Sequence, residues 1–221
     1  MSPPRSKLPS QSAALAGVPA GVQAAGPWAG RRQLFVRFAG EAETATIYSA
    51  EALQVELRRL AERSHYHSIA IGGRDPLGES AFLAATLAAG VPLPVMLDHD
   101  GQRPEALEPL LPSVQLVQVG LDGCEGEAAM ERVCDSLRVA AARRVRQAVA
   151  IVPAESASDA RLLRIVEQVH GASSDVCVVV HPTSESFAGR DRRWTVWLER
   201  ATAVHGDVRL LPRIPGPTGM R

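Results

Sequence analysis

Three polar residues whose side chains could do chemistry stand together in the middle of the chain. Asp98, His99 and Asp100 follow the apolar run LPVML (93–97). Carboxylate and imidazole groups serve as general acids and bases and as metal ligands. Three consecutive residues of one loop seldom all bind one ion, so a solvated polar loop is the competing interpretation. His181 also follows an apolar run, and it is the best single candidate for ligand contact, with a packed, hydrogen-bonded histidine as its alternative.

A second group of candidates contains a glycine pair. The run SIAIG (68–72) ends in Gly72 and continues with Gly73, Arg74 and Asp75. Two adjacent glycines let a ligand approach the backbone closely, because neither carries a Cβ atom. The same pair also serves in ordinary turns between a strand and a helix, and the sequence leaves both interpretations open.

The elements that must position these residues alternate regularly from Arg31 onward. Short apolar runs separated by turn residues indicate strands, and longer segments with helical period indicate helices. The predicted strands are 34–38, 68–72, 93–97, 114–120, 145–152, 175–180 and a closing stretch, 208–212. The predicted helices are about 50–64, 79–89, 104–111, 126–143, 158–170 and 191–204.

This alternation indicates an α/β fold. Strands that are apolar along most of their length belong to a parallel sheet that is covered by helices or curled into a barrel. Six β/α units favour a partial (β/α)6 TIM-like barrel, and a doubly wound open sheet is the alternative. In both architectures, ligands bind at the carboxyl ends of the strands. We therefore expect a ligand cleft formed by Gly72, Gly73, Arg74, Asp75, Asp98, His99, Asp100 and His181.

The first thirty residues have a different composition. They are rich in Pro, Ala, Ser and Gly and show no sustained hydrophobic period. A segment of this kind buries too little apolar surface to offset the entropy of ordering. The prediction is a disordered extension over residues 1–30, followed by one domain over residues 31–221. Within the extension, Trp28 either docks on the domain or is solvated.

Composition narrows the classes of function. The formal net charge is zero and the pI is about 7.0, so no basic footprint for nucleic acid or anionic membranes is expected. No apolar run approaches the roughly 18 residues that cross a bilayer, and no apolar secretory signal opens the chain. Cys124, Cys134 and Cys177 are widely spaced, which predicts neither a disulfide framework nor a paired-cysteine metal site. The expected compartment is the cytoplasm.

Five segments, in order, resemble the radical S-adenosylmethionine superfamily. More narrowly, the chain is similar to the short-barrel group that contains 7-carboxy-7-deazaguanine synthase and the radical-activating enzymes. The segments resemble the strand before the cluster loop, the GGEP-containing unit with its TNG-like turn, the next β/α unit, the sixth strand and the closing segment. They are 35–40, 71–101, 106–123, 176–186 and 208–221.

The resemblance implies a chemistry that the sequence does not support. The family holds a [4Fe–4S] cluster and S-adenosylmethionine through a CxxxCxxC motif after the first strand. Here the corresponding loop is short, EAETATIY (41–48), and contains no cysteine. The acid of the GGEP motif is displaced by Arg74 and Asp75, and the TNG-like asparagine is His99 or Asp100.

The sequence therefore predicts a degenerate radical-SAM-fold protein without the cluster, for which no cofactor is predicted. Such a protein would bind a small-molecule ligand, or act as the partner subunit of another enzyme or as a homodimer, and would not bind nucleic acid or membranes. Two enzymes compete with this reading. One is a radical enzyme with borrowed cluster ligands, and the other is a non-radical enzyme that uses the Asp and His residues at the strand ends.

Overall fold

The computed structural model describes residues 11–183 and 192–212, which form helices and one ten-stranded sheet. The strands are β1 (Ser12–Gly17), β2 (Ala20–Val22), β3 (Arg32–Phe38), β4 (Thr46–Ser49), β5 (Ser68–Gly73), β6 (Val95–His99), β7 (Leu116–Leu121), β8 (Arg146–Ile151), β9 (Cys177–Val180) and β10 (Val208–Leu210). The α-helices are α1 (Ala50–Arg63), α2 (Ser80–Ala88), α3 (Glu127–Ala142), α4 (Asp159–Ala172) and α6 (Arg193–Val204). Shorter 3-10 turns are η1 (Pro76–Glu79), η2 (Pro104–Ala106) and η3 (Glu108–Ser113).

The sheet is largely parallel and open. Its strand order is β10-β9-β8-β7-β6-β5-β3-β1-β4, and β2 pairs with β3 off this path. All pairs from β3 to β10 along this order are parallel, whereas β1 and β2 run antiparallel to β3, and β4 runs antiparallel to β1. The predicted α/β class is thus confirmed, with β4 and β10 as the two edges of the sheet.

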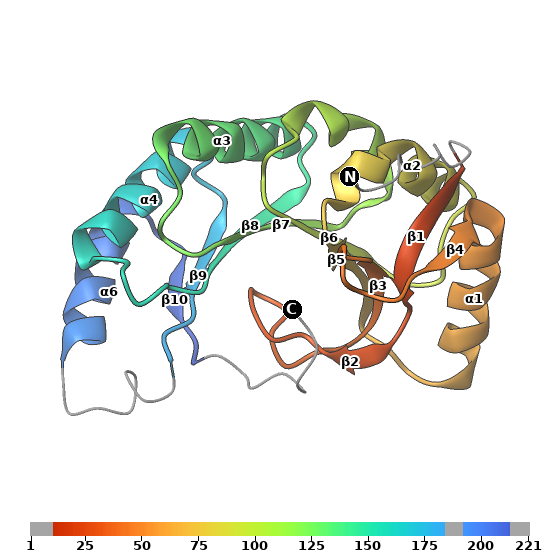
Figure 1. Cartoon of the computed structure of the whole chain (residues 1–221). Coiled ribbons are helices and arrows are strands. Elements are labelled where there is room, and N and C mark those ends of the chain that lie inside the picture. The colour runs from red at the N-terminus through yellow and green to blue at the C-terminus, as the bar shows by residue number, and fades with distance from the viewer. Residues whose placement is uncertain (1–10, 184–191, 213–221) are drawn as a thin grey trace.

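The α-helices cover one side of the curved sheet. In Figure 1, α1, α2, α3, α4 and α6 lie along its outer side, and the chain between β2 and β3 lies inside the curve. Successive side chains of a strand point to opposite faces. In β6, Val95 and Leu97 therefore join the large apolar cluster under the helices, whereas Met96 joins a smaller cluster on the inner face.

Local chemistry explains several element boundaries. The hydroxyl of Ser49 accepts a hydrogen bond from the backbone of Ala52 at 3.1 Å, and Ser158 caps α4 in the same way. Such caps satisfy backbone N–H groups that the first helical turn leaves free. The predicted helix at 104–111 is instead the pair of 3-10 turns η2 and η3. Pro109 and Pro112 lack the N–H groups that a continuous α-helix needs.

The structure differs from the expectation of disorder at the N-terminus. Residues Ser12–Gly17 form β1 between β3 and β4, and Ala13 and Leu15 are completely buried. The sequence ALAG alternates for only a few residues, so its pattern is too short to stand out. Its partners β3 and β4 lie more than fifteen residues away along the chain, and pairing over that distance has no local signal.

Candidate functional site

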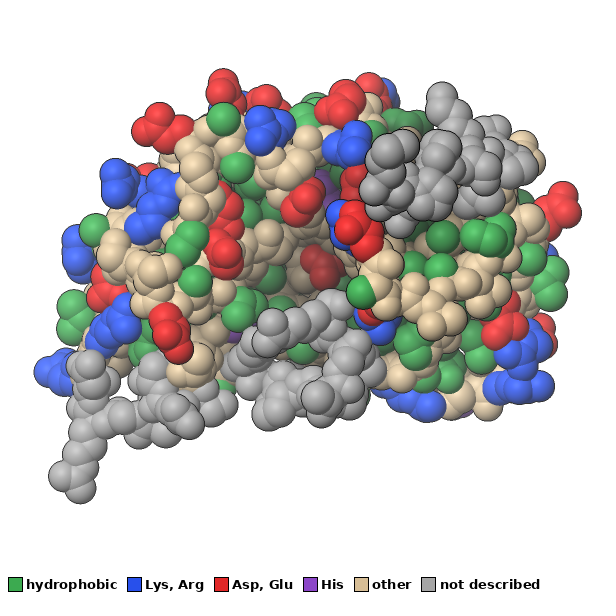
Figure 2. Space-filling view, in the orientation of Figure 1, with side chains coloured by type: hydrophobic (Ala, Val, Ile, Leu, Met, Phe, Trp, Pro, Cys, Tyr) green, Lys and Arg blue, Asp and Glu red, His purple; other side chains and the backbone are tan. Residues whose placement is uncertain are grey.

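Three adjoining cavities meet at Asp98. Their volumes are about 520, 210 and 550 Å³, and Asp98 lines all of them. They lie at the carboxyl ends of the parallel strands, as expected for a sheet of this kind. Figure 2 shows a hollow in the middle of this face with acidic side chains around it. We call the three cavities together the Asp98 cleft.

Asp98 reaches the cleft because it occupies an inward position of β6. Its Oδ1 accepts a hydrogen bond from Nε2 of Gln118 on β7 at 3.2 Å. Among the described residues, this is the only hydrogen-bond partner of the carboxyl group. Burial raises the pKa of Asp98 to about 6, and the Gln118 hydrogen bond opposes this change. The carboxyl group is therefore mostly ionised at neutral pH, and it forms no ion pair with the described part of the chain.

Small residues leave room around the carboxyl group. Gly72 lines the second cavity, and a Cβ atom there would lie 3.4 Å from the backbone oxygen of Asp98. Gly120 lines the first and third cavities, and Ala150 lines the first. Because these residues lie on the inner face at neighbouring strands, larger side chains there would fill the cleft.

His99 and Asp100 do not join Asp98 as a ligand set. Nδ1 of His99 accepts a hydrogen bond from the backbone of Gly101 at 3.1 Å, and burial lowers the histidine pKa to about 4. His99 is therefore neutral near pH 7, and its Nε2 has no partner among the described residues. Asp100 accepts a hydrogen bond from the backbone of Gln102. Both side chains thus shape the turn and also line the third cavity. Asp100 is exposed, as a solvated polar loop would have it, whereas His99 is buried.

Gly73, Arg74 and Asp75 form the rim of the third cavity. Asp75 accepts two hydrogen bonds from Arg103 at 2.8 and 2.7 Å, and Arg74 pairs with Glu41 at 2.8 Å. Gly73 has a φ of +100°, and a Cβ atom there would lie 2.5 Å from the oxygen of Phe38. Gly73 is therefore required by the turn, although it also lines the second and third cavities, whereas Gly72 lines the second cavity without this backbone constraint.

His181 lies beneath a loop that the sequence did not indicate. Residues 23–31, the inner loop, connect β2 to β3 and cross the inner face of the sheet. The backbone N–H of Gly26 donates to Nε2 of His181 at 2.8 Å. Trp28 packs against the inner apolar cluster, and its ring contacts His67 edge to face at 4.8 Å between centroids. His181 is thus buried and hydrogen-bonded. Of the two alternatives for Trp28, the structure shows docking on the domain and not a solvated side chain.

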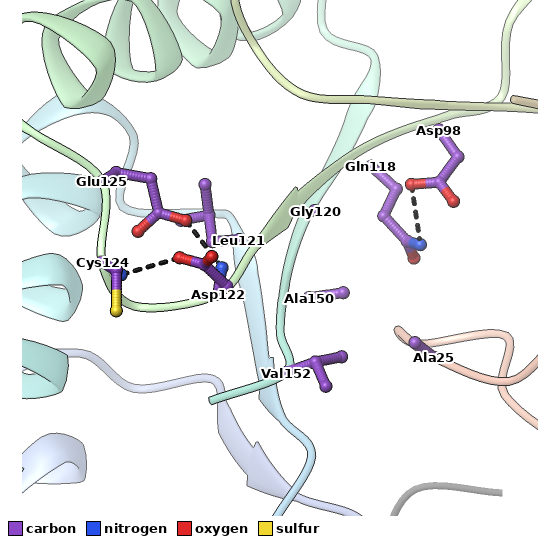
Figure 3. A pocket seen from close by; sticks show the side chains of 10 residues that line it. All are labelled: Ala25, Asp98, Gln118, Gly120, Leu121, Asp122, Cys124, Glu125, Ala150 and Val152. Carbon is purple, nitrogen blue, oxygen red and sulfur yellow. Dashed lines mark hydrogen bonds between the residues drawn. The ribbon is translucent and has the colours of Figure 1, made fainter. Parts of the chain in front are cut away.

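Polar residues after β7 complete the first cavity. Figure 3 shows Asp122, Cys124 and Glu125 across the cavity from Asp98 and Gln118. Glu125 accepts hydrogen bonds from the backbone of Asp122 at 2.6 Å and of Gly123 at 3.1 Å, so the turn itself fixes its carboxylate. Residues 122–124 come just after the predicted strand 114–120, so the strand-end rule is the signal that could have identified them. Gln118 could have been found by counting two residues back from Gly120 along the inward side of the strand.

The residues present do not fit a [4Fe–4S] cluster. The loop between β3 and β4 contains no cysteine, and the three cysteines of the chain lie after β7, in α3 and in β9. Cys134 and Cys177 are buried, and burial raises the pKa of the Cys177 thiol to about 12. Over residues 11–183 and 192–212, no three His, Cys, Asp or Glu side chains are grouped as metal ligands.

Comparison with known proteins identifies no family. No protein-family model matches the chain, and no curated protein sequence matches it. No helix in the described part of the chain is both long and apolar enough to cross a membrane.

Proposed function

We propose that this chain binds a small molecule in the Asp98 cleft through N–H groups of the ligand. The observation that carries the proposal is the state of the Asp98 carboxyl group. It is half-buried, it borders all three cavities, and Gln118 is its only described hydrogen-bond partner. A carboxylate that loses part of its hydration and gains one hydrogen bond destabilises the fold, and a ligand cation or N–H donor lowers that cost.

The charge of the first cavity favours a cationic ligand. Its described lining includes the carboxylates of Asp98, Asp122 and Glu125 and no Arg, Lys or His side chain. Ammonium, amidinium and guanidinium groups donate charge-assisted hydrogen bonds to carboxylates. A molecule with one of these groups and an apolar body would match the carboxylates together with Leu121, Ala150 and Val152.

We also propose that the protein is a cluster-free member of the radical-SAM type of fold, with a curved sheet equivalent to a partial barrel. The order of the parallel strands and the short loop after β3 support this assignment. A ligand-binding or partner subunit follows from it, because the loop lacks the thiolates that radical chemistry needs. Three free cysteines suit a reducing compartment such as the cytoplasm.

A non-radical enzyme is the second candidate, and the raised pKa of Asp98 favours it. A carboxyl group with a pKa of about 6 exchanges protons readily near neutral pH, which is what a general acid or base requires. In that case Asp98 would take a proton from the bound molecule, and Gln118 would hold the carboxylate in place. Turnover of a bound ligand that disappears in the variant Asp98→Asn would distinguish this enzyme from a binding protein.

A thermal-shift screen at about pH 8 tests the proposed function. The set should contain small amines, amidines and guanidines together with anionic molecules of similar size. A bound ligand raises the melting temperature, and its concentration dependence gives the affinity. We expect cationic ligands to stabilise the wild-type protein and not Asp98→Asn. Asp135→Asn, which removes an exposed carboxylate of α3, is the matched control. Equal shifts in both variants would contradict the proposal.

A further inference from the structure

We propose that the inner loop, residues 23–31, is a gate that opens, and that His181 and Gln118 beneath it are ligand-binding residues. This inference rests on the proposed function for the identity of the site, since the loop covers the part of the cleft that lies beside Asp98. The motion itself is a property of the chain without ligand.

The inner loop is closed on itself, and the Trp28 ring and one hydrogen bond hold it on the sheet. Its base is fixed by hydrogen bonds of Gln23 and Gly30, each at 2.9 Å, in continuation of the β2–β3 pair. Ala29 and Arg31 bond within the loop as well. Among the described residues, the single hydrogen bond that leaves the loop for the sheet joins Gly26 to His181. A segment with internal hydrogen bonds and few external ones can move as a unit.

The closed position of the loop leaves a polar group unsatisfied. Gln118 is almost completely buried, and its Oε1 has no hydrogen-bond partner within residues 11–183 and 192–212. The carboxylate of Asp98 only accepts hydrogen bonds, so it holds Nε2 of Gln118 toward itself and turns Oε1 away. Oε1 then faces Gly26, where an added Cβ atom would lie 1.7 Å from it. Burying an unpaired carbonyl oxygen opposes the closed state.

Opening would join two cavities and uncover ligand-binding atoms. The first and second cavities share Ala25, Asp98 and Val152 in their lining, and Ala25 belongs to the loop. When the loop moves away, Oε1 of Gln118, whose amide already bonds to Asp98, becomes accessible, and so does Nε2 of His181, which Gly26 releases. Both atoms accept hydrogen bonds, so they extend the same preference for a ligand with several N–H groups.

Hydrogen exchange of the full chain, read by mass spectrometry, tests the opening. In the wild-type protein we expect amides of residues 23–31 to exchange at least tenfold faster than those of β3. Gly26→Ala should raise the exchange of the loop a further tenfold and leave β3 unchanged, because Ala at a φ of +82° clashes with Gln118. The control is Gly90→Ala, which has a similar φ of +77° and no neighbour within 4 Å.

Histidine modification with diethylpyrocarbonate tests whether opening exposes the proposed contact. His181 and His205 are equally buried, but His205 bonds to Val176 and His170, neither of which belongs to the loop. We expect His181 to react faster than His205, and Gly26→Ala to accelerate His181 alone. Exchange of the loop at the rate of β3, or a His181 as inert as His205 in both proteins, would overturn the gate. Since neither experiment uses a ligand, a failed ligand screen would count against the proposed function only.

Discussion

At the scale of single residues, the carboxyl group of Asp98 loses hydration on folding and gains one hydrogen bond, from Gln118. Its pKa is raised from 3.8 to about 6, so the folded protein binds this proton more tightly than the unfolded chain does. The resulting destabilisation is fully present above about pH 6. It is relieved as the pH falls through 6 toward 3.8. Residues that lower stability in this way are typical of binding and catalytic sites.

Asp98→Asn should therefore stabilise the protein, and the gain should depend on pH. We expect the free energy of unfolding to rise by about 1–3 kcal/mol at about pH 8, because the amide carries no charge to desolvate. The gain should shrink as the pH falls from 6 to about 4, where the wild-type carboxyl group is protonated. Urea unfolding at several pH values measures both effects. A gain of equal size at all pH values, or a loss at pH 8, would contradict the assigned burial of this charge.

The two adjacent glycines should respond differently to the same change. Gly73→Ala places a Cβ atom 2.5 Å from the Phe38 oxygen at a positive φ, so we expect a loss of about 1–3 kcal/mol in stability. Gly72→Ala meets its neighbours at 3.4 Å or more, and its stability should change by less than about 1 kcal/mol. Gly72→Ala should instead weaken ligand binding, because it narrows the second cavity. Chemical denaturation of both variants measures the two changes in stability. Equal losses of stability would contradict the different roles assigned to Gly72 and Gly73.

At the scale of elements, the hydrophobic pattern of the sequence predicts the strands and helices that form from their own residues. The strands β5 to β9 were predicted because each is a continuous apolar run between turns, and α1 and α4 because apolar residues recur at helical spacing. The strand-end rule then brought Gly72 and Asp98 to one cleft. The ends of these elements moved by only a few residues in the structure.

Elements that depend on pairing with residues far away in the sequence were not predicted. The segment of β4 was assigned to the loop 41–48. Thr46 and Ile47 are exposed in the structure, and the pairing with β1 is what makes the segment a strand. The role of Gln118 was missed for the same reason, since its neighbours Asp98 and Gly26 come from other parts of the chain. His181 was identified by its place after a strand, but the loop that covers it could not be inferred from composition.

At the scale of the whole molecule, the helices cover the outer side of the sheet, and the N-terminal segment covers part of its inner side. Trp28 packs on the inner apolar cluster, where Arg146 also lies over its ring at 6.0 Å. Without this segment, the inner face would expose Met96, Leu116 and Val179 to water. One short loop therefore packs Trp28 on the inner apolar cluster and places Ala25 in the lining of the first and second cavities.

Removing residues 1–30 should consequently disrupt the fold. The truncated chain loses β1 with the buried Leu15, leaves β4 without a partner and uncovers the inner cluster. Burial of one leucine side chain contributes about 1.5–3 kcal/mol, and several such losses together should lower the melting temperature by more than about 10 °C. The reference is a chain that begins at Gln11 and keeps all described strands. Calorimetry of the two chains measures the difference, and melting within a few degrees of each other would show that the N-terminal hairpin is not part of the core.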